Sequence, residues 1–418
     1  MVDTNVIKFK NPEAGTTDLL TTVIRNTAKE MIAYAVEAEL REFIKQHEHL
    51  SCENGKKRVV RNGYLPERTI TTGVGSVDVK VPRVRDRKEV SDTIKFNSQI
   101  VPKHLRRSAS MDELLPLLYL KGVSTNDFQQ ALEPLVGKEA KNISPAVISR
   151  LKSSWINEYN DWRKIDLSDK NYVYWWADGI YLQARMEESK NCVLVIIGVT
   201  PEGKKELVGL EIGYRESKES WRTLLLDIQS RGLSKSPLLT TGDGALGLWG
   251  ALSEIHPDTA HQRCWVHKTA NVLDKLPKSL KKTAKTILHD IYMAEYRDEA
   301  KKNIQKFSNT FRNKYPKAVE CLLKDEIELL AFYDFPAANW QHIRTTNPIE
   351  STFATVRHRT YKAKGCFSQT TILTMVFKLC CGAEKRWKKL YGYEDLRELS
   401  MGIKFKDGVK IDQVGKVA

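Results

Sequence analysis

Apolar residues change their spacing along the chain, and the first change falls near residue 50. Residues 17–47 repeat apolar positions at helical spacing, which predicts one long helix. Residues 52–93 instead alternate apolar and polar side chains, with Gly73 and Gly75 between two short strands. Basic residues flank this segment, so we expect a β-ribbon that either lies against a DNA backbone or is a solvated hairpin.

Helical spacing returns in residues 111–162, which predict consecutive short helices. Ser144 suits an N-cap, and Pro145 suits the first turn of the last helix. That helix turns Trp155 toward its neighbours and Arg150 outward. The arrangement is typical of a helix-turn-helix with its last helix in the major groove, although three helices packed without touching DNA would give the same pattern.

A strand-rich pattern begins after residue 170, with apolar runs separated by turns or helical segments. The runs are YVYWWA (172–177), CVLVIIGVT (192–200), KELVGLEIG (205–213), PLLTT (237–241) and residues 260–265. Three strands come first, and a helix, a strand, a helix, the last strand and a further helix follow. This order is that of a ribonuclease H-like α/β domain with a mixed sheet, in which the first and fourth strands are neighbours.

Two acidic residues follow strands of this predicted sheet. Asp178 closes the first strand, and Asp243 follows the fourth within a glycine-flanked turn. A third carboxylate, Glu350, lies in the first turn of a helix that Asn347 caps and Pro348 starts. Each acid alone could be a turn residue, an N-cap or part of a capping box. Together, on the expected elements, the three predict one catalytic and metal-binding site.

Three carboxylates suit the cutting and joining of phosphodiester bonds. Two Mg²⁺ ions about 3.5–4 Å apart stabilise the attacking and the leaving oxygen, and Mg²⁺ prefers oxygen ligands. We expect Mn²⁺ to substitute for Mg²⁺. After water has cut one strand, the freed 3′-hydroxyl can attack a second strand at the same site. Arg357 lies two turns beyond Glu350 on the same helical face, where it could hold a phosphate.

The sequence QRCWVHK (262–268) supplies a Cys-x-x-His pair next to the last predicted strand. A structural zinc site would need a second half, for which His256 and His261 are the nearby candidates. A single half-site favours the other interpretation, in which Cys264 and His267 shape the junction beside the acidic residues.

Composition and charge restrict the class of partner. The net charge is +15, and excess positive charge attracts polyanions, of which nucleic acid is the commonest. The seven cysteines are scattered, which favours reduced thiols. No apolar run is long enough to cross a bilayer, and the opening MVDTNVIKFK lacks the apolar core of a secretory signal. We therefore expect a cytoplasmic, nucleoid-associated protein that binds double-stranded DNA and no membrane.

The chain resembles the mutator-type transposases of bacterial insertion sequences, from about residue 60 to about residue 395. The motifs that carry the resemblance are RNGY (61–64), VPRVRDRK (81–88), YLKGVSTNDF (119–128), SPAVISRL (144–151), WADGIYLQ (176–183), the Asp-x-x-x-Gly of Asp243 to Gly247, QRCWVHK (262–268), FYDFPAANW (332–340) and RTTNPIESTFATVR (344–357). They are far more specific than a lone glycine pattern. The first sixty residues match least.

The resemblance implies an Asp-Asp-Glu transposase whose catalytic core is interrupted by an all-α insertion between the second Asp and the Glu. It implies Asp178, Asp243 and Glu350 as metal ligands, and Cys264 with His267 as the family's paired motif. Members of the family bind terminal inverted repeats, act as dimers and commonly pass through a circular DNA intermediate. We expect the same of this chain, with terminal repeats and target DNA as its substrates.

The expected domain order places DNA binding before catalysis. An N-terminal helix and basic β-ribbon for dimerisation and DNA binding are expected in residues 1–108, and a helix-turn-helix-like region in 109–168. The remaining domains are the catalytic core in 169–265 and 339–400, the all-α insertion in 266–338 and a C-terminal tail in 401–418. The expected DNA-contacting residues are Lys56, Lys57, Arg58, Arg61, Arg83, Arg85, Arg150, Lys152 and Arg344.

Two other functions are compatible with the sequence. A non-catalytic DNA-binding regulator would bind the same ends through residues 52–162 without cutting them. A structure-specific nuclease of the same fold, such as one that acts on Holliday junctions, would choose DNA by branch shape. Metal-dependent cleavage of a terminal repeat separates the transposase from the regulator, and dependence on end sequence separates it from the nuclease.

Overall fold

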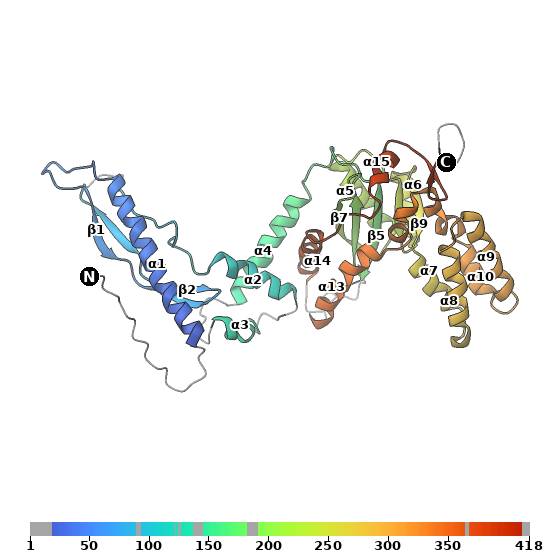
Figure 1. The fold of residues 1–418 in the computed structure, drawn as a ribbon, viewed down its shortest axis with the longest axis horizontal. Helices are drawn as coiled ribbons and strands as arrows, with labels where there is room; N and C mark the ends of the chain where they lie inside the picture. The colour runs from blue at the N-terminus through green and yellow to red at the C-terminus, as the bar shows by residue number, and fades with distance from the viewer. Residues whose placement is uncertain are drawn as a thin grey trace, which may run out of the picture. The chain divides into compact units, whose positions relative to one another are not determined.

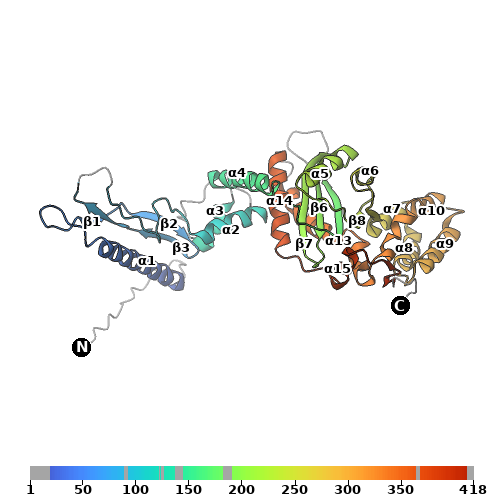
Figure 2. The ribbon, with the colours of Figure 1, turned by 90° about the horizontal axis from the view of Figure 1, so that it is seen from above.

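The structure is a computed structural model that describes residues 19–88, 93–121, 123, 127–136, 145–181, 191–363 and 368–411. The chain divides into two units, residues 1–151 and 152–418, and each is considered by itself (Figures 1 and 2). Helix α4 (Pro145–Trp162) begins in the first unit and ends in the second. Among the described residues, no helix is both long and apolar enough to span a membrane.

The first unit is built on helix α1 (Leu19–Gln46), which packs on a β-hairpin. Strands β2 (Arg68–Thr72) and β3 (Gly75–Val79) form this hairpin, as predicted. A second antiparallel pair, β1 (Val59–Tyr64) with β4 (Pro82–Asp86), was not predicted, because its mostly exposed polar residues hide any alternation. The buried core between helix and strands contains Val36, Ile70, Val77, Val79, Val81 and Val101.

Three helices follow the strands and confirm the predicted succession of short helices. They are α2 (Ala109–Leu120), α3 (Phe128–Val136) and α4. On α4, Trp155 is buried and Arg150 is exposed, as the helical pattern predicts, whereas Lys152 is half-buried. The predicted N-cap, Ser144, lies outside the described residues. A helix-turn-helix role for these helices stays a prediction.

The second unit is built around a mixed five-stranded sheet with the strand order β7-β6-β5-β8-β9. The strands are β5 (Tyr174–Tyr181), β6 (Asn191–Val199), β7 (Lys205–Tyr214), β8 (Leu239–Gly242) and β9 (Ala260–Arg263). Strand β6 is antiparallel to β5 and β7, whereas β8 runs parallel to β5 and β9 runs parallel to β8. The predicted succession of elements and the predicted contact between the first and fourth strands are therefore confirmed.

Helices cover both faces of this sheet (Figure 1). Helices α5 (Lys218–Ser230) and α6 (Leu246–Ile255) pack on one face. Helices α13 (Asn347–Ala363) and α14 (Gln369–Glu384) pack on the other. Strand β5 is buried on both faces, which explains why its sequence is an unbroken apolar and aromatic run.

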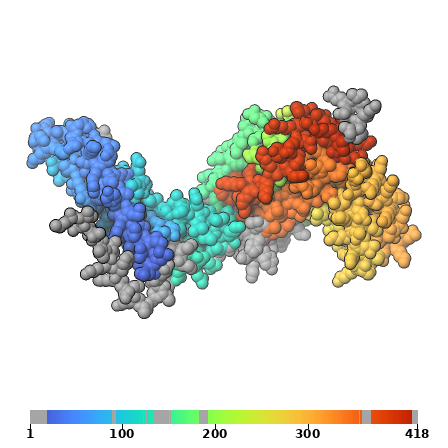
Figure 3. Space-filling model, in the orientation of Figure 1, coloured from blue at the N-terminus to red at the C-terminus, as the bar shows by residue number. Residues whose placement is uncertain are grey.

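The segment between β9 and α13 is helical, as its spacing predicts. Its apolar residues form one continuous core with the sheet face that α13 covers. In Figure 3 the first helices of this segment (yellow) lie beside the C-terminal part of the chain (red). The helices are α7 (Trp265–Leu273), α8 (Lys278–Tyr292), α9 (Arg297–Phe311), α10 (Pro316–Leu323), α11 (Glu326–Leu329), η1 (Ala331–Asp334), η2 (Ala337–Asn339) and α12 (Trp340–Ile343).

The C-terminal segment is more ordered than its sequence indicates. After helix α15 (Glu394–Ser400), where we expected a tail, strands β10 (Phe405–Lys406) and β11 (Val409–Lys410) form a hairpin. The Gly408 amide donates a hydrogen bond to the Tyr333 carbonyl (3.2 Å), so the hairpin is attached to η1. Strands of two residues are too short to give a periodic signal.

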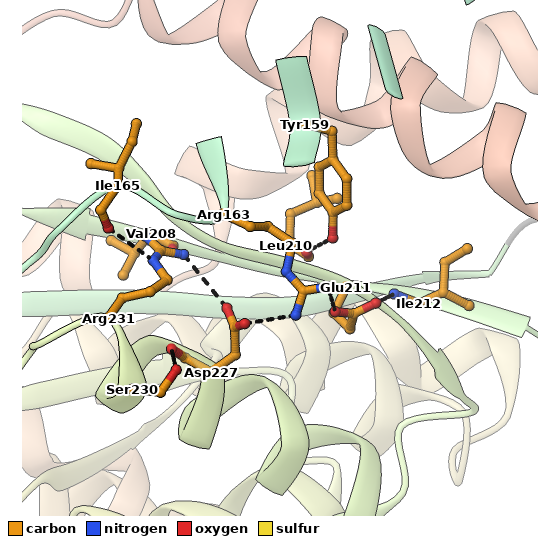
Figure 4. Close-up of polar contacts among 10 residues, drawn as sticks. All are labelled: Tyr159, Arg163, Ile165, Val208, Leu210, Glu211, Ile212, Asp227, Ser230 and Arg231. Carbon is orange, nitrogen blue, oxygen red and sulfur yellow. Dashed lines mark hydrogen bonds and ion pairs between the residues drawn. The ribbon is translucent and has the colours of Figure 1, made fainter. Parts of the chain in front are cut away.

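Polar contacts attach the end of α4 to the sheet and to α5 (Figure 4). The Arg163 guanidinium lies 3.0 Å from the Glu211 carboxylate on β7 and 2.6 Å from the Asp227 carboxylate on α5. The Tyr159 hydroxyl donates to the Leu210 carbonyl (2.9 Å). These contacts make the C-terminal half of α4 part of the second unit.

Candidate active site

Asp178 lies inside strand β5 rather than at its end, which corrects the prediction from sequence. Strand β5 pairs with β6 as far as Tyr181, but its pairing with β8 ends at Ala177. The longer antiparallel partner therefore keeps Asp178 within the strand, one residue beyond the last β5–β8 pair. Asp178 is only 5% exposed, and its Oδ1 accepts a hydrogen bond from the Gly179 amide (2.8 Å).

Asp243 follows β8 directly, as predicted, and a tight turn fixes its direction. Its Oδ1 accepts a hydrogen bond from the Ala245 amide (2.8 Å). Gly244 has a φ of +91°, and a Cβ at this position would lie 2.0 Å from the Arg263 guanidinium. Glycine is required here because the backbone is left-handed and a side chain covers it closely.

Glu216 joins the two aspartates, although the sequence pattern did not single it out. Carboxylate oxygens of Asp178, Glu216 and Asp243 all lie within 4.8 Å of one another. Glu216 follows β7, and the pairing directions place the C-terminal ends of β5, β7 and β8 at the same edge of the sheet. The predicted topology contained this signal, because an acid after the third strand must lie near acids of the first and fourth.

Burial and mutual repulsion disfavour the ionised forms of these carboxyl groups. Burial, followed by the charge of Asp243, raises the pKa of Asp178 to about 7. Burial, followed by the charges of Asp243 and Asp178, raises the pKa of Glu216 to about 8. The buried Oε2 of Glu216 has no hydrogen-bond partner in the described part of the chain. A divalent cation prefers oxygen ligands and would offset the repulsion among these carboxylates. The three acids therefore fit a divalent-cation site.

A second group of possible ligands comes from helices. Ligand atoms of Cys264, His267 and Glu350 lie within 4.8 Å of one another. Cys264 immediately precedes α7, His267 lies in the first turn of α7, and Glu350 lies in the first turn of α13. The Nδ1 of His267 is 3.8 Å from Oε1 of Glu350. The Cys-x-x-His pair therefore lies beside Glu350, one of the acids predicted from the sequence.

Thr346, which the sequence reasoning missed, links the members of the second group. It is fully buried, and its hydroxyl donates a hydrogen bond to Oε1 of Glu350 (2.7 Å). Its amide donates to the Sγ of Cys264 (3.3 Å). The Thr346 carbonyl also accepts from the Glu350 amide (3.0 Å), so Thr346 takes the capping position that we predicted for Asn347.

Electrostatic interactions connect the two groups. The hydrogen bond with Cys264 is the largest cause of a raised pKa at His267, about 9, and the charges of Asp178 and Glu350 add to it. The charge of Glu350 also raises the pKa of Asp178. A protonated His267 thus lies among acidic groups at neutral pH, and both groups contribute to one electrostatic environment.

The two histidines considered for zinc lie elsewhere. His256 packs edge-on against Trp175, with ring centroids 5.2 Å apart. His261 stacks on Trp249, with ring centroids 4.7 Å apart. Neither histidine belongs to the group formed by the Cys-x-x-His pair and Glu350, so they do not complete a zinc site with it.

Arg357, predicted to support the site, and Arg344, predicted to contact DNA, have different environments. Arg344 is half-buried, and its guanidinium bonds to the Tyr292 carbonyl and lies 5.2 Å from the centre of the Tyr292 ring. It therefore joins the segment before α13 to the end of α8. Arg357 is exposed on α13, with its guanidinium 5.8 Å from the Phe353 ring. Phosphate contacts by either residue stay predictions.

The basic residues predicted to contact DNA in the first unit differ in their partners and in their exposure. Three form ion pairs within the unit: Lys57 with Glu48, Arg58 with Asp86 and Arg61 with Glu37. Arg83 donates to a backbone carbonyl, that of Asn62 (2.8 Å). Lys56, Arg83, Arg85 and Arg150 have exposed side chains. Arg58 is the most enclosed of the ion-paired residues, with 17% of its side chain exposed and both guanidinium contacts to Asp86 at 2.8 Å.

Comparison with known proteins identifies relatives over most of the chain. The family model described as transposase, Mutator family, matches residues 3–390. The transposase for insertion sequence element IST2 of Acidithiobacillus ferrooxidans is 51% identical over 281 residues, 67% of this chain and 95% of the relative. The transposase for insertion sequence element IS6120 of Mycolicibacterium smegmatis is 49% identical over 278 residues, 66% of this chain and 85% of the relative. The transposase for IS256 in transposon Tn4001 of Staphylococcus aureus is 28% identical over 360 residues, 85% of this chain and 86% of the relative.

Proposed function

This chain belongs to the Mutator family of transposases, and from that premise we propose that it cuts and joins DNA at a site formed by Asp178, Asp243 and Glu350. The main support for the proposal is that acids from two neighbouring parallel strands lie close together. Asp178 and Asp243 come from β5 and from the end of β8, 65 positions apart in the sequence, and their carboxylates are within 4.8 Å of each other. The group that contains Glu350 interacts with Asp178 electrostatically.

The catalytic unit is, in this proposal, a ribonuclease H-like core with an all-α insertion. The sheet order β7-β6-β5-β8-β9, with β6 antiparallel to its neighbours, supports this assignment. So do the helices on both sheet faces and the helical segment before α13. The fold assignment and the Asp-Asp-Glu class are thus one hypothesis, because the fold brings the acids together.

Asp178, Asp243 and Glu350 would hold two Mg²⁺ ions, for which Mn²⁺ would substitute. When bound, the ions supply charge stabilisation for the attacking and leaving oxygens of the phosphodiester. The protein residues orient the DNA and exclude competing water. His267, whose Nδ1 lies 3.8 Å from Oε1 of Glu350, would donate a hydrogen bond to a phosphate oxygen bound nearby. Arg357 would hold a phosphate farther along α13.

The proposed substrates are double-stranded terminal inverted repeats and target DNA, with a circular intermediate. The relatives are transposases for insertion sequence elements, which supports element ends as substrates. The net charge of +15 and exposed basic side chains such as Lys56, Arg85 and Arg150 support contacts with phosphates. Helices α2 to α4 would act as the helix-turn-helix.

We also propose a homodimer, because α1 has a second apolar face opposite the one that packs on the hairpin. The exposed fractions are 65% for Leu20, 42% for Ile24, 67% for Met31 and 71% for Tyr34. Their spacing of four, seven and three residues is that of a coiled-coil seam, which a second copy of α1 would cover. Light scattering on a variant with Met31→Lys and Tyr34→Lys should report a monomer, whereas a dimer would refute this interface.

The experiment that tests the function uses labelled DNA from the regions that flank the coding sequence. We expect nicking and strand joining at the element ends in Mg²⁺ or Mn²⁺ and none in chelator. Asp178→Ala, Asp243→Ala and Glu350→Ala should each abolish both reactions, and Asp258→Ala, which removes an exposed acid before β9, should retain them. Binding without metal-dependent cleavage would indicate a regulator, and cleavage governed by branch shape would indicate a structure-specific nuclease.

A further inference from the structure

Glu216 occupies a fixed position at the sheet edge. It lies two residues after β7 and directly before Ser217, whose hydroxyl caps α5 by accepting from the Ser220 amide (3.2 Å). The backbone is also enclosed from the side of α6, because a Cβ on Gly247 would lie 2.1 Å from the Glu216 carbonyl oxygen. The start of α5 and the start of α6 therefore determine where this side chain begins.

The Glu216 side chain extends toward the two aspartates. A Cβ on Gly179 would lie 2.5 Å from Oε1 of Glu216, so the absence of a side chain after Asp178 leaves room for this carboxylate. The carboxylate oxygens of Glu216, Asp178 and Asp243 are within 4.8 Å of one another. One acid from within β5 and two from just beyond β7 and β8 therefore meet in one small volume.

The side chains around Glu216 leave one of its oxygens unpaired. His267 contributes a positive charge to its surroundings, but the Oε2 atom of Glu216 is buried and has no hydrogen-bond partner in the described part of the chain. A buried carboxylate oxygen without a partner is costly, and a cation within ligand distance removes that cost.

We propose that Glu216 is a further ligand of the divalent cation that Asp178 and Asp243 hold. This inference rests on the proposed function and deepens it, because it makes the sheet edge a three-carboxylate site that is complete without Glu350. The sheet-edge cation then binds before DNA and independently of α13. Glu350 acts on the second cation, together with the substrate.

The alternative is that Glu216 is a protonated acid that only fills space beside the Tyr181 hydroxyl, with which its carboxyl group forms a hydrogen bond. The two roles differ in metal affinity. Glu216→Gln preserves shape and hydrogen-bonding capacity but removes the charge. Glu219→Gln is the matched control, because Glu219 lies three residues beyond Glu216, in the first turn of α5, and its side chain is 78% exposed.

The test is a titration of the metal-free full-length chain with Mn²⁺, followed by electron paramagnetic resonance. We expect Glu216→Gln to weaken the tightest Mn²⁺ site by about 10- to 100-fold, Glu350→Gln to leave that site intact, and Glu219→Gln to match the wild type. If Glu216→Gln keeps wild-type affinity while Asp243→Asn weakens it, the role of Glu216 is overturned but the proposed metal site is not. Wild-type affinity in Asp243→Asn as well would overturn the proposed metal site itself.

Thermal unfolding of the same variants shows whether a substitution changes the stability of the fold as well as the affinity for metal. Without metal, removal of one like charge from the group should leave the unfolding temperature of Glu216→Gln equal to or higher than that of the wild type. With Mg²⁺, the rise in unfolding temperature should be smaller in Glu216→Gln than in Glu219→Gln. A large loss of stability without metal would assign Glu216 a structural role and overturn the inference.

Discussion

The sheet-edge acids and the helix-borne Glu350 are held in place by different kinds of interaction. Asp178 is part of a strand paired with β6, and Asp243 follows directly from a strand paired on both sides. Glu350 depends instead on side-chain contacts, with the Thr346 hydroxyl at 2.7 Å and His267 at 3.8 Å. The two parts of the site can therefore be disturbed separately. Substitutions that remove charge affect the sheet-edge acids, and substitutions that remove a supporting side chain affect Glu350.

The largest effect is expected from Asp178→Asn and Asp243→Asn. Each substitution removes a negative charge from the sheet-edge group without a change in shape. The rate of strand cleavage should fall by about 1,000-fold, which corresponds to about 4 kcal/mol of lost transition-state stabilisation. Single-turnover cleavage of a terminal-repeat substrate measures this loss. Near-normal cleavage by either variant would remove the sheet edge from the reaction.

A smaller effect is expected from Thr346→Val, which keeps side-chain volume but deletes the hydroxyl that orients Glu350. One hydrogen bond to a charged group contributes about 1.5 kcal/mol, so cleavage should slow by about tenfold. Affinity for the first Mn²⁺ should not change, because that site lies at the sheet edge. Thr346→Ser should restore the rate, and a serine variant as slow as the valine variant would refute the positioning role.

The last prediction concerns the stability of the metal-free protein rather than a reaction rate. The pKa values of Asp178 and Glu216, about 7 and about 8, lie above those of unfolded carboxyl groups, so the metal-free folded state holds more protons. Stability of the metal-free protein should therefore fall as pH rises from about 4, near the unfolded pKa values, to about 8, by at most about 1.4 kcal/mol per pH unit for each proton. Mg²⁺ binds the ionised form, so the increase in unfolding temperature with Mg²⁺ should grow from pH 6 to pH 8. An equal increase at both pH values would contradict the raised pKa values.

The second unit could be predicted in outline because its signals are local and strong. Apolar runs such as residues 172–177 mark buried strands, and the turn glycine at position 244 marks the exit of β8. The order of these elements then implied that Asp178 and Asp243 would meet. The position of Asp178 inside β5 was not predictable, because it depends on how far β6 pairs beyond β8.

The remaining features depend on partners far away in the sequence. Glu216 looks like an ordinary acid near the start of a helix, and only the shared edge of three strands gives it neighbours. Arg58 looks like a DNA-binding residue, yet its partner Asp86 lies 28 positions later. The pairing of β1 with β4 was missed for the same reason, since exposed edge strands have little apolar pattern.

The most direct measurement is the location of Mn²⁺ by anomalous scattering in crystals of the full chain bound to its terminal-repeat DNA. We predict one ion ligated by carboxylates of Asp178 and Asp243, and a Glu350 oxygen within about 2–2.3 Å of a second ion about 3.5–4 Å from the first. A Glu350 carboxylate more than about 10 Å from both ions, well over twice their expected separation, would contradict the account.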